Sequence, residues 1–248
     1  MVTNLAYFFE TARKVRGGKA VWVKDSNGED RKNVLLGGTI ANPNKGFGHL
    51  WAAQLMQYTP GQSMYIFRSF AVQANAASDA TTIYLKGDGY SDAPEVGMVL
   101  MVAPEALNVE TTTYTTTESS GTYTTTASTT VAEYTGQSTV VTAVEYDAAN
   151  EKFKLTISTA LGELTAGDIL VEAQGTTASA SAKVLVPNPN VFVEADRDMM
   201  PTDGYGLQNA NYSASAVYDK QAWIARMQPL PKYVLAKNRS FINGIFWI

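Results

Sequence analysis

Alternation of apolar and polar side chains is the clearest pattern in this sequence, and it is strongest between residues 96 and 186. Phe153, Leu155 and Ile157 alternate with polar neighbours, which predicts a half-buried strand over 153–158. Residues 139–146 alternate in the same way. The turn-forming residues 147–150 lie between the two runs, so we expect a hairpin. Further strands are expected at 98–102, 169–173 and 182–186.

The N-terminal region has a less regular pattern. Apolar residues at helical spacing predict a helix over residues 4–16, which Gly17 ends. A strand over 19–24 is expected to form a hairpin with 34–36 around an Asp-Ser-Asn-Gly turn. Two more strands are expected at 64–72 and 80–85.

The C-terminal region begins with a Pro-rich linker at 187–190 and a short expected strand at 191–193. Residues 196–212 show no periodicity. A helix is expected over 214–227, because Ser213 can cap its start and Pro229 and Pro231 would end it.

Short strands separated by turns every 8 to 12 residues are typical of barrels and sandwiches. We therefore expect a mainly β protein, with a small barrel or sandwich domain and short N- and C-terminal helical segments. The expected division is an N-terminal anchoring and β region over 1–95, a β domain over 96–186 and a C-terminal segment over 187–248. The β domain carries a Thr-rich insertion at 111–139.

The Thr-rich insertion holds twelve threonines in the twenty residues from Thr111 to Thr130. Threonine favours strands but offers little apolar area for a core. Three structures fit this composition: an extended loop, a solvent-facing β-ribbon, or a ribbon that pairs with copies of itself. A long insertion in a compact domain usually projects outward or has a function.

Composition and charge narrow the function classes. The formal net charge is -4, charged residues are 17% and no basic stripe is present, so we expect no nucleic-acid partner. The mild acidity does not favour a membrane surface, and no apolar run approaches the length of a transmembrane helix. No secretory signal is recognisable, so synthesis in the cytoplasm is expected.

Candidate chemistry is sparse. The chain has no cysteine, and His49 is its only histidine, without a Gly-x-Ser-x-Gly pattern for a hydrolase nucleophile. We interpret His49 as a loop histidine with a structural hydrogen bond. Tyr90, Asp92 and Glu95 lie near a Gly-rich turn, but their spacing indicates no specific chemistry. The densest acidic cluster surrounds Arg197 and consists of Glu194, Asp196, Asp198 and Asp203.

The acidic cluster could bind calcium or supply an acid/base pair, but its spacing matches no EF-hand loop. We interpret it as a solvated or Arg-paired surface. The expectation is therefore a protein that is not an enzyme and that has no catalytic residues, metal or cofactor.

Both ends of the chain are rich in large apolar side chains, which are costly to leave in water. We expect them to be buried in the core or between subunits. The candidate interface residues are Phe8, Phe9, Phe241, Ile245, Phe246, Trp247 and Ile248.

Several stretches between about residues 30 and 175 together resemble a known family. They are residues 37–43 (Gly-Gly-Thr-Ile-Ala-Asn-Pro), 48–52, 58–61 and 70–72, then 81–84, 87–90 and Pro94, and finally 141–144, 155–157, 160–161 and 167–173. The pattern resembles the head fibre or capsid decoration proteins of tailed phages, particularly those of gut Bacteroidetes phages. The Thr-rich insertion departs from that pattern.

The resemblance implies a homotrimer on the capsid exterior of a virion, bound to the major capsid protein at a site of local threefold symmetry. It carries no catalytic residues. The expected function is a structural virion protein that decorates or stabilises the capsid by burying surface shared between subunits.

Two alternatives stay open. A carbohydrate- or receptor-binding adhesin module of a phage particle could stack host surface glycans on Tyr114, Tyr123 and Tyr134. A hydrolase could use Asp196 and Asp198 of the acidic cluster.

Overall fold

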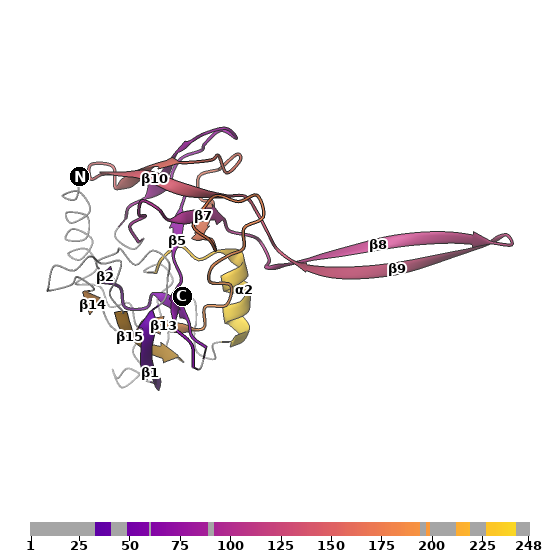
Figure 1. The fold of residues 1–248 in the computed structure, drawn as a ribbon, viewed down its shortest axis with the longest axis horizontal. Coiled ribbons are helices and arrows are strands. Elements are labelled where there is room, and N and C mark those ends of the chain that lie inside the picture. Colours follow the sequence, from indigo (N-terminus) through magenta and orange to yellow (C-terminus); the bar gives the residue numbers. More distant parts are fainter. Residues whose placement is uncertain are drawn as a thin grey trace.

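In the part of the chain that the structure describes, two antiparallel sheets and one helix form the body, and a two-stranded ribbon projects from it (Figure 1). The computed structural model describes residues 33–40, 49–59, 61–88, 92–193, 197–198, 212–218 and 227–241. The expectation of a mainly β protein is confirmed.

The larger sheet has six strands in the order β5-β12-β7-β10-β11-β6. They are β5 (Ser69–Ala71), β6 (Thr82–Lys86), β7 (Val99–Val102), β10 (Ser138–Asp147), β11 (Lys152–Ile157) and β12 (Ile169–Glu172). The predicted strands at 80–85, 98–102, 139–146, 153–158 and 169–173 are confirmed. The predicted hairpin is also confirmed, because β10 pairs with β11 around residues 148–151.

The six-stranded sheet curls until its two end strands approach each other. An isolated bridge joins Val72, just after β5, to Leu85 of β6, and the Gln73 amide donates to the Tyr84 carbonyl at 2.8 Å. The strands that the structure describes nevertheless form no closed barrel.

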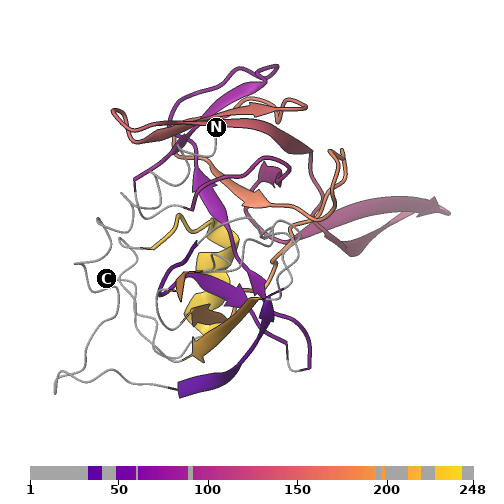
Figure 2. The ribbon, with the colours of Figure 1, turned by 60° about the vertical axis from the view of Figure 1, so that its left-hand side comes forward.

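The second sheet has five strands in the order β1-β15-β13-β3-β4 (Figure 2). They are β1 (Asn33–Ile40), β3 (Leu55–Gln57), β4 (Tyr65–Ile66), β13 (Val191–Val193) and β15 (Tyr212–Tyr218). A small separate pair joins β2 (His49–Leu50) to β14 (Arg197–Asp198). The expected strand at 191–193 is confirmed. The described partner of β1 is β15; the expected strand at 19–24 lies outside the described residues.

The chain passes from one sheet to the other at Phe67 and Arg68. The prediction of one strand over 64–72 is therefore wrong, because β4 pairs with β3 and β5 pairs with β12. An unbroken apolar run cannot reveal such a break, since both halves are buried equally well.

Two apolar clusters form the core, one on each face of the larger sheet. Along β7, Val99 and Met101 join the first cluster, whereas Leu100, and Met98 just before the strand, join the second. This alternation follows from the period of two in a strand. The first cluster also takes in Leu55 and Phe192 of the smaller sheet. Each fully buried Leu, Phe or Met contributes about 1.5–3 kcal/mol to folding.

Helix α2 (Lys232–Phe241) covers the first cluster with Tyr233 and Val234. The prediction of a helix over 214–227 is wrong where it can be compared, because residues 212–218 form β15. The interior position of β15 between β1 and β13 supplies hydrogen bonds on both sides, and these override a weak helical spacing. Pro231 precedes a helix rather than ending one, as its fixed φ permits.

Two other expectations from the sequence concern residues 182–186 and residues 4–16. The expected strand over 182–186 is wrong: its backbone makes only isolated bridges, from Ala182 to Gly136 and from Val184 to Ala173. The expected helix over 4–16 lies outside the described residues. In the described part of the chain, no helix has the length and apolarity needed to cross a membrane.

Candidate functional site

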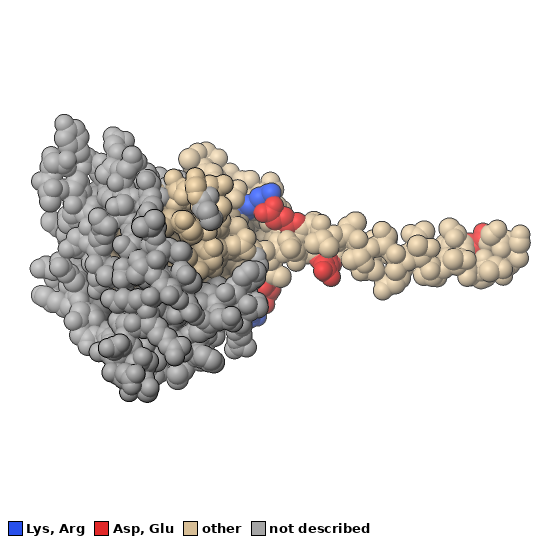
Figure 3. All heavy atoms as spheres, turned by 90° about the horizontal axis from the view of Figure 1, so that it is seen from below, with Lys and Arg blue, Asp and Glu red and all other residues tan. Residues whose placement is uncertain are grey.

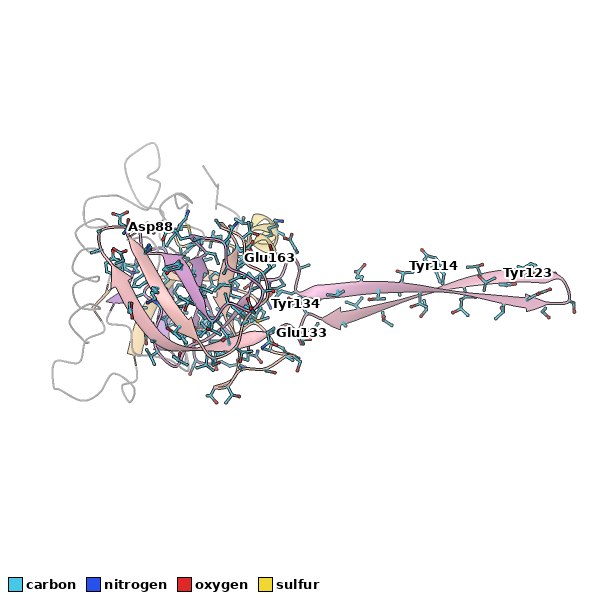
Figure 4. All side chains as sticks on the ribbon, turned by 90° about the horizontal axis from the view of Figure 1, so that it is seen from above. Asp88, Tyr114, Tyr123, Glu133, Tyr134 and Glu163 are labelled. Atoms are coloured by element: carbon cyan, nitrogen blue, oxygen red, sulfur yellow. The ribbon has the colours of Figure 1, made fainter. Side chains whose placement is uncertain are left out.

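The ribbon is the most distinctive surface of the molecule. Strands β8 (Asn108–Ser119) and β9 (Thr122–Glu133) pair antiparallel over twelve residues each, and every one of these residues is exposed. The ribbon projects from the body, as Figure 4 shows from above. At about 3.3 Å per residue, its length is about 40 Å. Of the three structures expected for the insertion, the loop is wrong and the β-ribbon is confirmed, within the bounds 108–133.

The tip of the ribbon is a two-residue turn formed by Ser120 and Gly121. Their φ angles are 53° and 77°, both in the left-handed region. Two such residues make the turn whose twist matches a right-handed ribbon. A Ser-Gly pair suits this turn, because glycine adopts positive φ without steric cost.

Threonine hydroxyls link the two strands across the ribbon. The Oγ1 atoms of Thr112 and Thr129 lie 2.9 Å apart, and those of Thr116 and Thr125 lie 3.0 Å apart. Cross-strand threonine pairs of this kind contribute about 0.2–1 kcal/mol each. They support the ladder in the absence of any core beneath it.

The root of the ribbon is fixed to the body. Leu107 and Tyr134, on either side of the ladder, pack against the first core cluster, and the Tyr134 amide donates to the Leu107 carbonyl at 2.7 Å. Gly136 and Ala182 exchange two backbone hydrogen bonds, each 2.9 Å long. A side chain at Gly136 would meet the Tyr134 hydroxyl. Outside, Lys183 forms an ion pair with Glu133.

The two faces of the ribbon differ in charge, because side chains alternate between faces along each strand. One face, here called the charged face, carries Asn108, Glu110, Thr112, Tyr114, Thr116, Glu118, Tyr123, Thr125, Ala127, Thr129, Val131 and Glu133. The other, here called the uncharged face, carries Val109, Thr111, Thr113, Thr115, Thr117, Ser119, Thr122, Thr124, Thr126, Ser128, Thr130 and Ala132.

All ribbon glutamates and both ribbon tyrosines thus belong to the charged face. Figure 3 shows how few charged side chains the visible side of the ribbon carries beyond its root. The threonine content predicted a ribbon but not this segregation of charge. The signal was present in the even positions of Glu110, Tyr114 and Glu118.

An open groove of about 700 Å³ lies where the ribbon leaves the body. Its walls come from the root of the ribbon, the start of β12 and the start of α2, and include Ala103, Val109 and Ile169. Lys232 in its lining is paired with Glu105 at 2.7 Å. The groove therefore presents a mixed apolar and charged surface beside the ribbon.

The densest buried group of charges surrounds Arg68, at the crossing between the two sheets. The Arg68 guanidinium donates to Glu95 at 2.9 Å and to the Ala93 carbonyl at 3.1 Å, and the Gln54 amide donates to Asp92. Burial lowers the pKa of Arg68, but attraction to Glu95, Glu172 and Asp92 outweighs it and holds the pKa above its ordinary value. The guanidinium is permanently charged. Its bonds to Glu95 and Ala93 hold the segment at which the chain crosses between the sheets.

The structure places the other candidate residues in different regions. The backbone register of β2 and β14 sets His49 opposite Asp198, but their side chains lie outside the described residues, as do Glu194, Asp196 and Asp203. Tyr90 is also outside them. Among the described residues, no group of three His, Cys, Asp or Glu side chains is placed to hold a metal ion.

The candidate interface residues at the chain ends cannot be compared with this surface. Phe241 is the last residue of α2, and its side chain lies outside the described residues. The remaining six, Phe8, Phe9, Ile245, Phe246, Trp247 and Ile248, lie outside them entirely.

Comparison with known proteins adds no assignment. No protein-family profile, curated protein or solved structure matches this chain. The fold and the ribbon are therefore the basis for a proposal of the class of protein.

Proposed function

We propose that this chain is a non-catalytic structural protein of a phage particle, a head fibre or capsid decoration protein that binds the outer capsid lattice as a homotrimer. In this proposal the two sheets stack as a sandwich, the body docks on the major capsid protein and the ribbon projects from the capsid exterior. The resemblance over residues 30–175 supplies the family.

The ribbon is the observation that supports the proposal. Its two strands are exposed along their whole length and contribute nothing to a core. An isolated two-stranded hairpin is at best marginally stable in water. A projection about 40 Å long therefore makes contacts outside its own domain and does not stabilise its own body.

The mass of the whole chain in solution tests the self-association. Light scattering during size-exclusion chromatography should give a mass near three times 26.8 kDa. A mass that stays at 26.8 kDa at every concentration would overturn the homotrimer.

A second experiment tests which part attaches to the particle. Replacing residues 109–132 by a short glycine-rich turn removes the ribbon but keeps Leu107 and Tyr134 at its root. This variant should bind purified heads that lack the protein as tightly as the wild type does. If it folds but no longer binds, attachment resides in the ribbon and the proposed arrangement is wrong.

The exposed tyrosines favour a second candidate function, an adhesin module that binds host surface glycans. Tyr114 and Tyr123 are 70% and 68% exposed and belong to the same face of the ribbon. Aromatic rings so exposed can stack on sugars. A glycan array probed with the wild type and with Tyr114→Ala separates the candidates, because only an adhesin would lose a signal.

A further inference from the structure

We propose that the uncharged face of the ribbon is a contact surface for a second copy of this chain, with the uncharged faces of neighbouring ribbons packed against each other. This inference rests on the self-association in the proposed function and names one surface that contributes to it. It follows from the ladder register, which assigns each side chain to a face.

Charge decides which face can be the contact. In a symmetric assembly the same surface meets itself or its symmetry mates, so identical residues come close together. The charged face would then bring Glu110 and Glu118 of each copy against those of the next. Like charges at an interface cost several kcal/mol. The uncharged face holds no ionisable side chain, so its self-association carries no such cost.

Side-chain size points to the same face. The uncharged face consists of threonine and serine with one valine and one alanine, all short and most of them β-branched. Such a surface has no long side chains that would hold neighbouring ribbons apart, so the ribbons can approach to about the 10 Å at which packed sheets lie. Threonine methyl groups would be buried in the contact, while the hydroxyls can bond to backbone carbonyls, as Thr130 already does to Thr111 at 3.3 Å.

The contact area fits copies that are held side by side. A face about 40 Å long and about 10 Å wide covers about 400 Å². This is about half of what each partner buries in a standard interface, about 800 Å². Ribbon contacts alone are therefore weak, and in the homotrimer they add to contacts between the bodies, which raise the effective concentration of the ribbons for one another.

A matched pair of substitutions tests the face. Thr115 and Thr116 are adjacent on β8, both are exposed and each faces a threonine across the ladder, but they lie on opposite faces. Thr115→Lys puts like charges into the proposed contact and should weaken self-association of the full chain about tenfold or more, measured by sedimentation equilibrium. Thr116→Lys, on the charged face, should change it by less than about twofold.

Cross-linking provides a second readout that does not depend on affinity. The chain contains no cysteine, so one introduced cysteine is the only thiol. Under oxidation, Thr115→Cys should give disulfide-linked dimers of the full chain, and Thr116→Cys should give few.

The outcomes separate this inference from the proposed function. Suppose that the wild type associates and that Thr116→Lys weakens the association as much as Thr115→Lys does, or more. This result overturns the contact face but not the self-association. A wild type that stays monomeric at all concentrations overturns both proposals. Preferential cross-linking through Thr116→Cys also overturns the contact face.

Discussion

The body and the ribbon of this protein obtain order from different sources. In the body, strands such as β7 are buried on both faces and apolar packing dominates. In the ribbon, all residues are exposed and order comes from the ladder, the threonine pairs and the turn at Ser120 and Gly121. A strand buried in a core is stabilised by its own chain, whereas an exposed ribbon is stabilised only locally until a partner covers it.

The largest difference should appear when an aromatic ring is removed from each part. Phe153→Ala empties a fully buried site beside Tyr146, whose ring centroid lies 4.9 Å away, and should lower the free energy of unfolding by about 4 kcal/mol. Tyr123→Ala on the ribbon should change it by less than about 0.5 kcal/mol. Urea denaturation followed by tryptophan fluorescence measures both. Equal losses would contradict the different sources of stability in body and ribbon.

A second prediction concerns the buried charges of the body. Arg68→Met leaves Glu95, Glu172 and Asp92 without their central cation and should cost about 3 kcal/mol of stability in the same experiment.

Lys154→Met is its control, because Lys154 pairs with Glu145 on the surface at 3.2 Å. Exposed pairs of this kind contribute less than about 1 kcal/mol. A loss for Arg68→Met no larger than that for Lys154→Met would show that the buried charges do not hold the crossing.

The third prediction isolates the ribbon. Gly121→Ala places a side chain at φ 77°, in open space, and should destabilise the ladder by about 1 kcal/mol. Hydrogen exchange of the ribbon amides should become about fivefold faster, while amides of the body stay unchanged.

Gly61→Ala is a matched control for the tip, because Gly61 has the same φ of 77° and nothing within 4 Å. It should leave the exchange of ribbon amides unchanged. Faster exchange throughout the body in Gly121→Ala would contradict the independence of the two parts.

The smallest effect is a pH dependence at the turn between β10 and β11. Hydrogen bonds from the side chain of Asn150 and from the backbone of Asn150 and Ala149 lower the pKa of Asp147. The turn is therefore fully capped above the ordinary pKa of an aspartate, and the cap is lost as pH falls through the lowered value. Amide shifts of Ala149 and Asn150 should titrate below about pH 4, and Asp147→Ala should abolish that titration.

Local patterns predicted the parts of the fold that depend on local sequence. The alternation at Phe153, Leu155 and Ile157 predicted β11, and the turn before it predicted its pairing with β10. The break at Arg68 and the strand β15 depend on partners far along the chain, which periodicity does not report. Helix α2 was missed because its described side chains that meet the core, Tyr233, Val234 and Leu235, are consecutive and show no helical spacing.

The candidate surface was predicted in part. Composition indicated a ribbon in two of the three possibilities, and turn chemistry at Ser120 and Gly121 would have located its tip. The even positions of Glu110, Tyr114 and Glu118 indicated one face along β8. Which residues of β9 share that face follows from the register, which a Thr-rich sequence leaves open.

The turn at the tip of the ribbon is the described part that lies far from the body. Ser120 and Gly121 lie at the far end of the ribbon, about 40 Å from its root, and the space around Gly121 is open. Exposed loop tips tolerate inserted sequence well. An epitope inserted between Ser120 and Gly121 would therefore be displayed away from the body. An antibody or a cell could bind it there without disturbing the core.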